Sequence, residues 1–150
     1  MRKLVLAALA ALAALFATGA AVAATAPAQA GDSTTCAGTI SISSLAWNPP
    51  QVRRGQGSAL TLVVRNCTGQ PLSGTLAHSL RWITPTYEQG CGPVYDPPPP
   101  MPVTITAPTW TNTMRFSTLP TCNATGLRVS VAVSAGSTSV GASAVLVITP

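Results

Sequence analysis

The sequence has very few charged side chains after its first residues. Charged residues make up 7% of the 150 residues, lysine is missing after position 3, and the only acids are Asp32, Glu88 and Asp96. The single histidine, His78, alternates with leucines and is expected on a core face. Because an enzyme needs a nucleophile with a base, or two carboxylates at working distance, we predict that this chain is not an enzyme. Glu88 and Asp96 share one loop, where a solvated pair is expected.

The arginines do not form the pattern that nucleic-acid binding needs. The net charge of +5 includes Arg2 and Lys3, and without them it falls to +3. Phosphate tracking needs a clustered basic stripe interleaved with aromatics, whereas the arginines here are scattered and the pair Arg53-Arg54 is expected in a solvated turn. We therefore expect no nucleic-acid partner. The remaining arginines are Arg65, Arg81, Arg115 and Arg128.

The first thirty residues have the features of an export signal. Arg2 and Lys3 precede an apolar run from Leu4 to Phe16, and a stretch of small residues ends at Ala28-Gln29-Ala30. This order is typical of a signal peptide that is cleaved after an Ala-x-Ala site. The bias toward Ala, Thr, Ser, Val and Pro is typical of a bacterial protein.

Two alternatives accompany this prediction. Cleavage around Ala23 is the second possible position, and an uncleaved anchor is the competing interpretation, because about 20 apolar residues span a bilayer. We predict a signal peptide over residues 1–30 and a secreted, extracellular domain over residues 31–150. No membrane contact is expected after cleavage.

All four cysteines lie in the exported part of the chain. Cys36, Cys67, Cys91 and Cys122 are separated by 31, 24 and 31 residues, and an oxidising compartment lets disulfides persist. A metal site would need CxxC pairs or a cluster of cysteine and histidine, and the spacing supplies neither. We expect two disulfides, no metal and no cofactor.

The hydrophobic period of the mature chain is two. No segment of ten or more residues has the period of an amphipathic helix, and apolar residues instead alternate with polar ones as in half-buried strands. Strands are predicted over Thr39 to Leu45, Ser58 to Asn66, Thr75 to Ile83, Val103 to Ala107, Trp110 to Phe116, Leu127 to Val133, and Val140 to Ile148.

Seven short strands in about 120 residues predict an all-β fold, an immunoglobulin-like antiparallel β-sandwich. Consecutive loops of such a sandwich alternate between its two ends. Cys36 is therefore expected near Cys67, and Cys91 near Cys122 at the opposite end. Of three possible connectivities we predict Cys36–Cys67 and Cys91–Cys122, each stabilising the fold by roughly 3 to 4 kcal/mol on the chain-entropy model.

The turn chemistry of one region resembles a known class of modules. Arg54-Gly55 through Leu60 to Asn66, followed by Leu72-Ser73-Gly74, is similar to bacterial immunoglobulin-like modules of adhesion and surface proteins. The resemblance implies a non-catalytic binding or spacer role. We predict a secreted binding or adhesion-type domain whose partner is an extracellular protein or a cell-wall polysaccharide.

A second resemblance lies in one loop. Cys91-Gly92-Pro93-Val94-Tyr95-Asp96-Pro97 resembles the reactive-site loop of the Streptomyces subtilisin inhibitor family, which carries Cys-Pro-Met-Val-Tyr-Asp-Pro or a relative. A rigid loop of this kind binds a serine protease at little cost in ordering entropy. The resemblance implies a subtilisin-like protease partner and a binding loop formed by Gly92, Pro93, Val94, Tyr95 and Asp96. Pro93 would occupy the primary specificity site and Val94 would follow the scissile bond.

Carbohydrate binding is a further alternative, because exposed tryptophan rings stack on sugars. Trp82 and Trp110 fall on apolar faces and are expected in the core. Trp47, beside Asn48-Pro49-Pro50, is the remaining candidate for an exposed ring.

Overall fold

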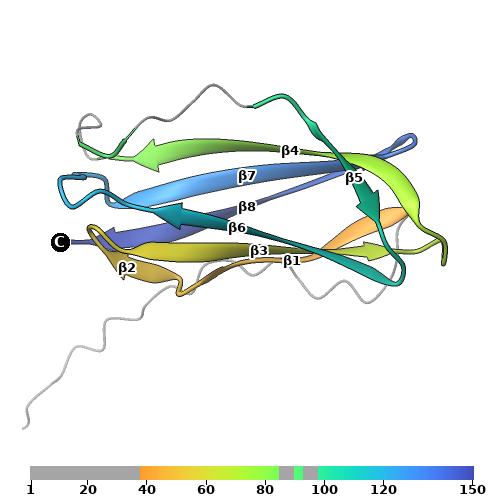
Figure 1. Ribbon diagram of the computed structural model, residues 1–150, viewed down its shortest axis with the longest axis horizontal. Helices are drawn as coiled ribbons and strands as arrows, with labels where there is room; N and C mark the ends of the chain where they lie inside the picture. Colours follow the sequence, from red (N-terminus) through yellow and green to blue (C-terminus); the bar gives the residue numbers. More distant parts are fainter. Residues whose placement is uncertain (1–37, 85–89, 93–97) are drawn as a thin grey trace, which may run out of the picture.

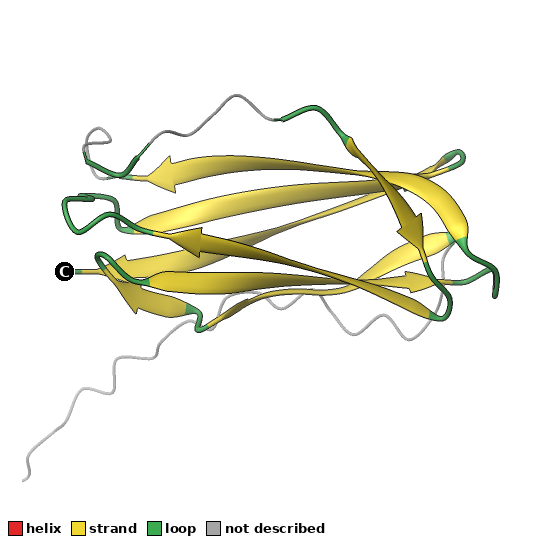
Figure 2. Ribbon diagram, viewed as in Figure 1, coloured by secondary structure: helices red, strands yellow, loops and turns green. Residues whose placement is uncertain are grey.

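A computed structural model describes residues 38–84, 90–92 and 98–150 of the chain. These residues form eight strands in two sheets and no helix (Figures 1 and 2), so the predicted all-β class is confirmed. Within these ranges, no helix is long and apolar enough to cross a membrane. The strands are β1 (Ile40–Asn48), β2 (Gln51–Arg53), β3 (Gly57–Asn66), β4 (Leu72–Ile83), β5 (Met101–Ile105), β6 (Thr109–Ser117), β7 (Gly126–Ala135) and β8 (Thr138–Thr149).

The two sheets divide the strands unequally. The smaller sheet has the order β1-β3-β6, and the larger has the order β2-β8-β7-β4-β5. All neighbours are antiparallel except β2 and β8, which run parallel. The hairpin between β7 and β8 turns at Gly136, whose φ of 58° is in the region that glycine adopts without strain.

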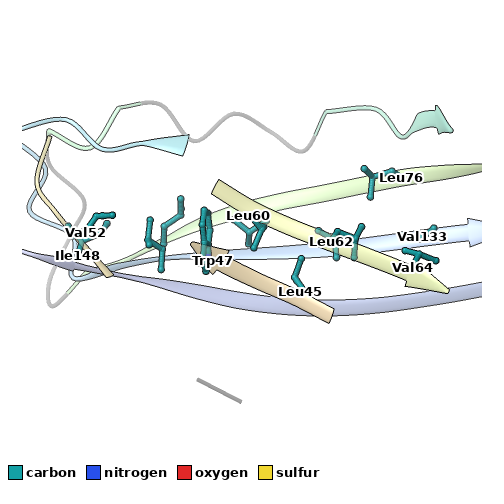
Figure 3. Close-up of a cluster of buried hydrophobic side chains, with 14 of the residues drawn as sticks. Leu45, Trp47, Val52, Leu60, Leu62, Val64, Leu76, Val133 and Ile148 are labelled. Carbon is teal, nitrogen blue, oxygen red and sulfur yellow. The ribbon is translucent and has the colours of Figure 1, made fainter. Parts of the chain in front are cut away.

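The core lies between the sheets and follows from the alternation of side chains (Figure 3). On β3 every second residue is buried, and Leu60, Leu62 and Val64 are fully enclosed. Val129 and Val133 on β7 face them from the other sheet with no exposed surface. The period of two in the sequence therefore correctly marks the inward faces of β3 and β7. On β1 the register shifts between Ile42 and Ser44, so the alternation at the start of that strand does not continue to its end.

Strand β2 is absent from the seven strands that the sequence predicts. Its three residues lie between the breaks at Asn48-Pro49-Pro50 and Gly55-Gln56-Gly57, and are too few to show a period. The pairing of Gln51 with Val147 and of Arg53 with Thr149 makes the segment a strand. Arg53 therefore ends a strand, and only Arg54 lies in the predicted turn; both side chains are exposed.

A buried asparagine organises the end of the molecule where β3 leads into β4. The Asn66 side chain is 4% exposed. Its Nδ2 donates to the carbonyl oxygens of Gln70 and Ile105, at 2.7 and 2.9 Å. Its Oδ1 accepts from the backbone N–H and the hydroxyl of Thr68, at 3.0 and 2.8 Å. One amide thus fixes the connecting loop and ties it to the last residue of β5.

We expect Asn66→Ala to lower the free energy of unfolding by about 2 to 4 kcal/mol, because the carbonyls of Gln70 and Ile105 lose their shared donor. Chemical denaturation measures the change. Thr61→Ala is the control, because it removes only an exposed hydroxyl contact of 3.4 Å to Thr113 and should change stability by less than about 0.5 kcal/mol. Equal effects of the two substitutions would contradict the assigned role of Asn66.

Candidate functional site

Three connections gather at one end of the molecule, the end that holds the C-terminus in Figure 1. β4 ends and β7 begins there, since Ile83 pairs with Gly126. β3 begins and β6 ends there as well, since Gly57 pairs with Ser117. The turn after β2, the start of the loop after β4 and the loop after β6 therefore lie together, and we call this region the loop end.

A disulfide joins two of these connections. Cys91 and Cys122 are bonded with a Cα–Cα distance of 4.0 Å, and both are buried. The Thr121 hydroxyl donates to the carbonyl oxygen of Gly90 at 2.9 Å, and the Ala124 N–H donates to the Cys91 sulfur at 3.4 Å. The predicted Cys91–Cys122 bridge is thus confirmed, and it fastens the loop after β4 to the loop after β6.

Hydrogen bonds tie the loop after β6 to its other neighbours. The Thr125 N–H donates to the last carbonyl of β4, on Ile83, at 2.8 Å. The N–H and the hydroxyl of Thr118 both donate to the carbonyl oxygen of Gln56 at 2.9 Å. The three connections of the loop end are therefore held together as one unit.

The residues predicted to form the binding loop lie only partly within the described structure. Gly92 is half-buried with a φ of 81° and lies beside Leu119, since a methyl group added to Gly92 would meet Leu119 Cδ1 at 3.6 Å. Pro93, Val94, Tyr95 and Asp96 lie outside the described residues. Leu119 is 47% exposed at the loop end and is not among the predicted site residues. Nothing in the local sequence separates this leucine from those of the core.

The tryptophan predicted to be exposed is buried. Trp47 is 7% exposed, and its ring packs edge-on against Phe116 with the centroids 5.2 Å apart. Its place on β1 explains the error, because Trp47 follows Leu45 on the inward face while Asn48 ends the strand. Trp47 offers no surface to a sugar ring. Trp82 and Trp110, predicted in the core, are partly buried and pack against it.

The second predicted disulfide is described at one cysteine only. Cys67 is disulfide-bonded, and its N–H donates to the carbonyl oxygen of Thr39 at 3.0 Å. Cys36 lies outside the described residues, so the bridge Cys36–Cys67 stays a prediction. Cys67 lies at the end of the molecule opposite Cys91, as the alternation of loops predicts.

The sheet register produces a basic pair that the sequence does not reveal. Arg81 on β4 and Arg128 on β7 are direct cross-strand partners. Both are exposed on the outer face of the larger sheet, because their neighbours Leu80, Trp82, Leu127 and Val129 face the core. The two arginines are far apart in the sequence, and only the register places them together. The sequence alone therefore predicts scattered arginines.

The histidine faces the interior. His78 pairs with Val131 on the inner face of β4, and its Nδ1 is buried without a hydrogen-bond partner. The three acids of the chain all lie outside the described ranges. Among the residues that are described, no three His, Cys, Asp or Glu side chains come close enough to hold a metal ion.

Comparisons with known proteins find chains of similar fold but no family. No family model and no curated protein matches the sequence. The chain is similar in structure to the Pseudomonas fluorescens alkylpurine DNA glycosylase AlkC, solved bound to DNA containing an abasic site analog, with a TM-score of 0.51 and 12% identity. That match covers 75% of this chain and 31% of the glycosylase.

A β-glucosidase from Listeria innocua, solved with gluconolactone, matches with a TM-score of 0.42 and 14% identity, over 74% of this chain and 16% of the enzyme. This chain thus spans less than a third of either protein. At these identities the glycosylase match shows a shared fold alone, and the lower TM-score of the glucosidase carries no argument.

Gly90 provides a test of the contact between the two joined loops. A methyl group at Gly90 would meet the carbonyl oxygen of Thr121 at 2.5 Å, whereas at Gly136 it would meet nothing within 4 Å. Both residues have positive φ, 65° and 58°. Each alanine substitution should therefore lower the free energy of unfolding by about 1 to 2 kcal/mol through backbone strain. Gly90→Ala should lower it by about 1 to 3 kcal/mol more, because the two joined loops must separate.

Thermal unfolding of Gly90→Ala and Gly136→Ala measures this difference. If both variants lost the same stability, the loop after β4 would not rest on Thr121 as described.

Proposed function

We propose that this chain is an exported, non-catalytic binding domain of immunoglobulin-like fold. The strand arrangement supports the fold assignment. In immunoglobulin domains the first, second and fifth strands share one sheet, and the third, sixth and seventh share the other. When β1 and β2 count as one split first strand, β1-β3-β6 and β8-β7-β4 follow this order. β5 departs from the constant-type pattern, because it pairs with β4 instead of extending the first sheet.

The observation that carries the binding role is the loop end. Domains of this fold present loops at the ends of the sandwich, and variable antibody domains bind through them. Here the disulfide and the bonds of Thr118, Thr121 and Thr125 hold three connections together in advance. A surface fixed before binding loses little conformational entropy when a partner docks. Leu119, exposed at 47%, offers that partner an apolar contact.

Export follows from residues 1–30 and gives the domain its setting. The signal-peptide pattern and the Cys91–Cys122 bridge both suit an oxidising, extracellular compartment. Accessible partners there are extracellular proteins and cell-wall polysaccharides.

A binding experiment on Leu119 tests this role. The full chain is expressed in a secreting bacterial host, and the protein is recovered from the medium with Gly31 as its expected first residue. Labelled protein should bind isolated cell walls saturably, and excess unlabelled protein should compete. Leu119→Ser should weaken binding about tenfold, because burying an exposed leucine side chain contributes about 1.5 kcal/mol or more.

Met101→Ser is the matched control for this experiment. Met101 is 42% exposed, close to the value for Leu119, but it pairs with Leu76 halfway along β4 and lies away from the loop end. Its substitution should leave binding unchanged. Absence of saturable binding by the unsubstituted protein would exclude a cell-wall partner, and equal losses in both variants would refute the placement of the binding surface at the loop end.

Serine protease inhibition is the second candidate, and the Cys91–Cys122 bridge favours it. The bridge fastens the start of the loop that carries Pro93 and Val94, as the resemblance to the subtilisin inhibitor family implies. The backbone at Gly92 argues the other way. Its φ of 81° is not that of the extended strand that such a loop presents to a protease.

Titration of the oxidised protein against subtilisin distinguishes the two functions. An inhibitor would remove enzyme activity stoichiometrically, and Val94→Pro or reduction of the disulfides would abolish the effect. A binding domain that contacts other partners leaves the protease fully active at micromolar concentration. We expect the second outcome because of the conformation of Gly92.

A further inference from the structure

The outer face of the larger sheet carries two like charges side by side. Arg81 and Arg128 occupy directly opposed positions on β4 and β7. Like charges in this position destabilise a sheet, and no Asp or Glu lies in residues 38–84, 90–92 or 98–150 to offset them. Two guanidinium groups on neighbouring strands present several N–H donors in one region, an arrangement suited to a carboxylate or phosphate oxygen.

The pair borders a shallow hollow of the surface. Arg81 and Arg128 line a shallow depression of about 290 Å³ together with Ile83 and Thr84. Arg53 projects from the same face near the same end, because Val52 beside it is buried and β2 belongs to the same sheet. Positive charge is therefore concentrated where this face meets the loop end.

On the side away from the loop end, the rows next to the arginines carry short, uncharged side chains. The row next to the arginines consists of three serines, Ser79, Ser130 and Ser143, one on each of β4, β7 and β8. The following row consists of Ala77, Ala132 and Gly141. Short side chains leave an extended molecule room to lie across the strands, and the three hydroxyls can donate and accept hydrogen bonds.

We infer that this face binds an anionic polysaccharide, with Arg81 and Arg128 holding one carboxylate or phosphate of the chain and the serine row contacting sugar hydroxyls. The inference rests on the proposed binding role and names the partner's chemistry. A nucleic acid fits less well, because its bases stack on exposed aromatic rings, and these rows of arginine, serine, alanine and glycine carry none. Here the charge occupies one end of the face, and the remainder is neutral.

Affinity electrophoresis of the oxidised mature protein tests the inference. Native gels contain polygalacturonate as a carboxylate polysaccharide, phosphorylated dextran as a phosphate polysaccharide, dextran as the neutral polysaccharide, or double-stranded DNA. The protein should be retarded by at least one of the two anionic polymers, which identifies the source of the anion, and dextran should not retard it. Added salt should weaken the retardation, because part of the attraction is between charges.

Two double variants with the same loss of charge separate a site from a general charge effect. Arg81→Gln/Arg128→Gln should raise the dissociation constant at least about tenfold, because both charged donors are lost. Arg65→Gln/Arg115→Gln removes two exposed arginines from the outer face of the smaller sheet. This control should change the dissociation constant less than about threefold. The melting temperature of the first variant should not fall, because a repulsive pair is relieved.

Several outcomes would overturn the inference. If both double variants bound the anionic polymers equally weakly, the effect would be one of net charge alone. If the protein bound DNA as tightly as the polysaccharides, the ligand would not be specifically a polysaccharide. Failure of both anionic polymers to retard the protein would overturn it directly. If cell-wall binding through Leu119 persists in Arg81→Gln/Arg128→Gln, the proposed function stands and only this inference fails.

Discussion

The whole structure depends on the packing of two sheets through side chains that alternate along each strand. Because successive residues point to opposite faces, a shift of one residue in the register of β3 would move Leu60, Leu62 and Val64 into solvent. The same constraint fixes the outer faces: once Leu80 and Val129 are inside, the residues next to them must be outside. The buried core thereby determines which arginines meet on the surface, although none of them contributes to it.

This dependence explains what the sequence can and cannot reveal. Alternation of apolar and polar residues in seven segments predicts the all-β class and seven of the strands, and the alternation of loops between two ends predicts the Cys91–Cys122 bridge. The inward position of Trp47 does not follow from the alternation at the start of β1, because the register shifts between Ile42 and Ser44 and reverses the faces of the residues that follow. The pairing of Arg81 with Arg128 also depends on register, which no single strand encodes. Local periodicity does not predict contacts between segments that are distant in the sequence.

Each end of the molecule has a disulfide-bonded cysteine, Cys67 at one end and Cys91 at the other, together with its own set of side-chain hydrogen bonds. At one end the Asn66 amide makes four hydrogen bonds to backbone and side-chain groups, so a polar side chain fixes the connection between β3 and β4. At the loop end a disulfide and a series of threonine bonds hold longer connections. Longer loops lose more entropy on closing, and a covalent bond between their midpoints offsets that loss. The part of the larger sheet's outer face that carries Arg81 and Arg128 adjoins the loop end.

The parallel pairing of β2 with β8 has a mechanical consequence. β1 begins at the end of the molecule opposite the C-terminus and leads into β2 in the same direction, and β8 runs beside β2 to Thr149 (Figure 1). Tension applied between Ile40 and Pro150 would therefore draw β2 and β8 past each other lengthwise. In that geometry the hydrogen bonds of the pair bear the load together instead of opening one after another. The short strand β2 therefore resists extension of the chain.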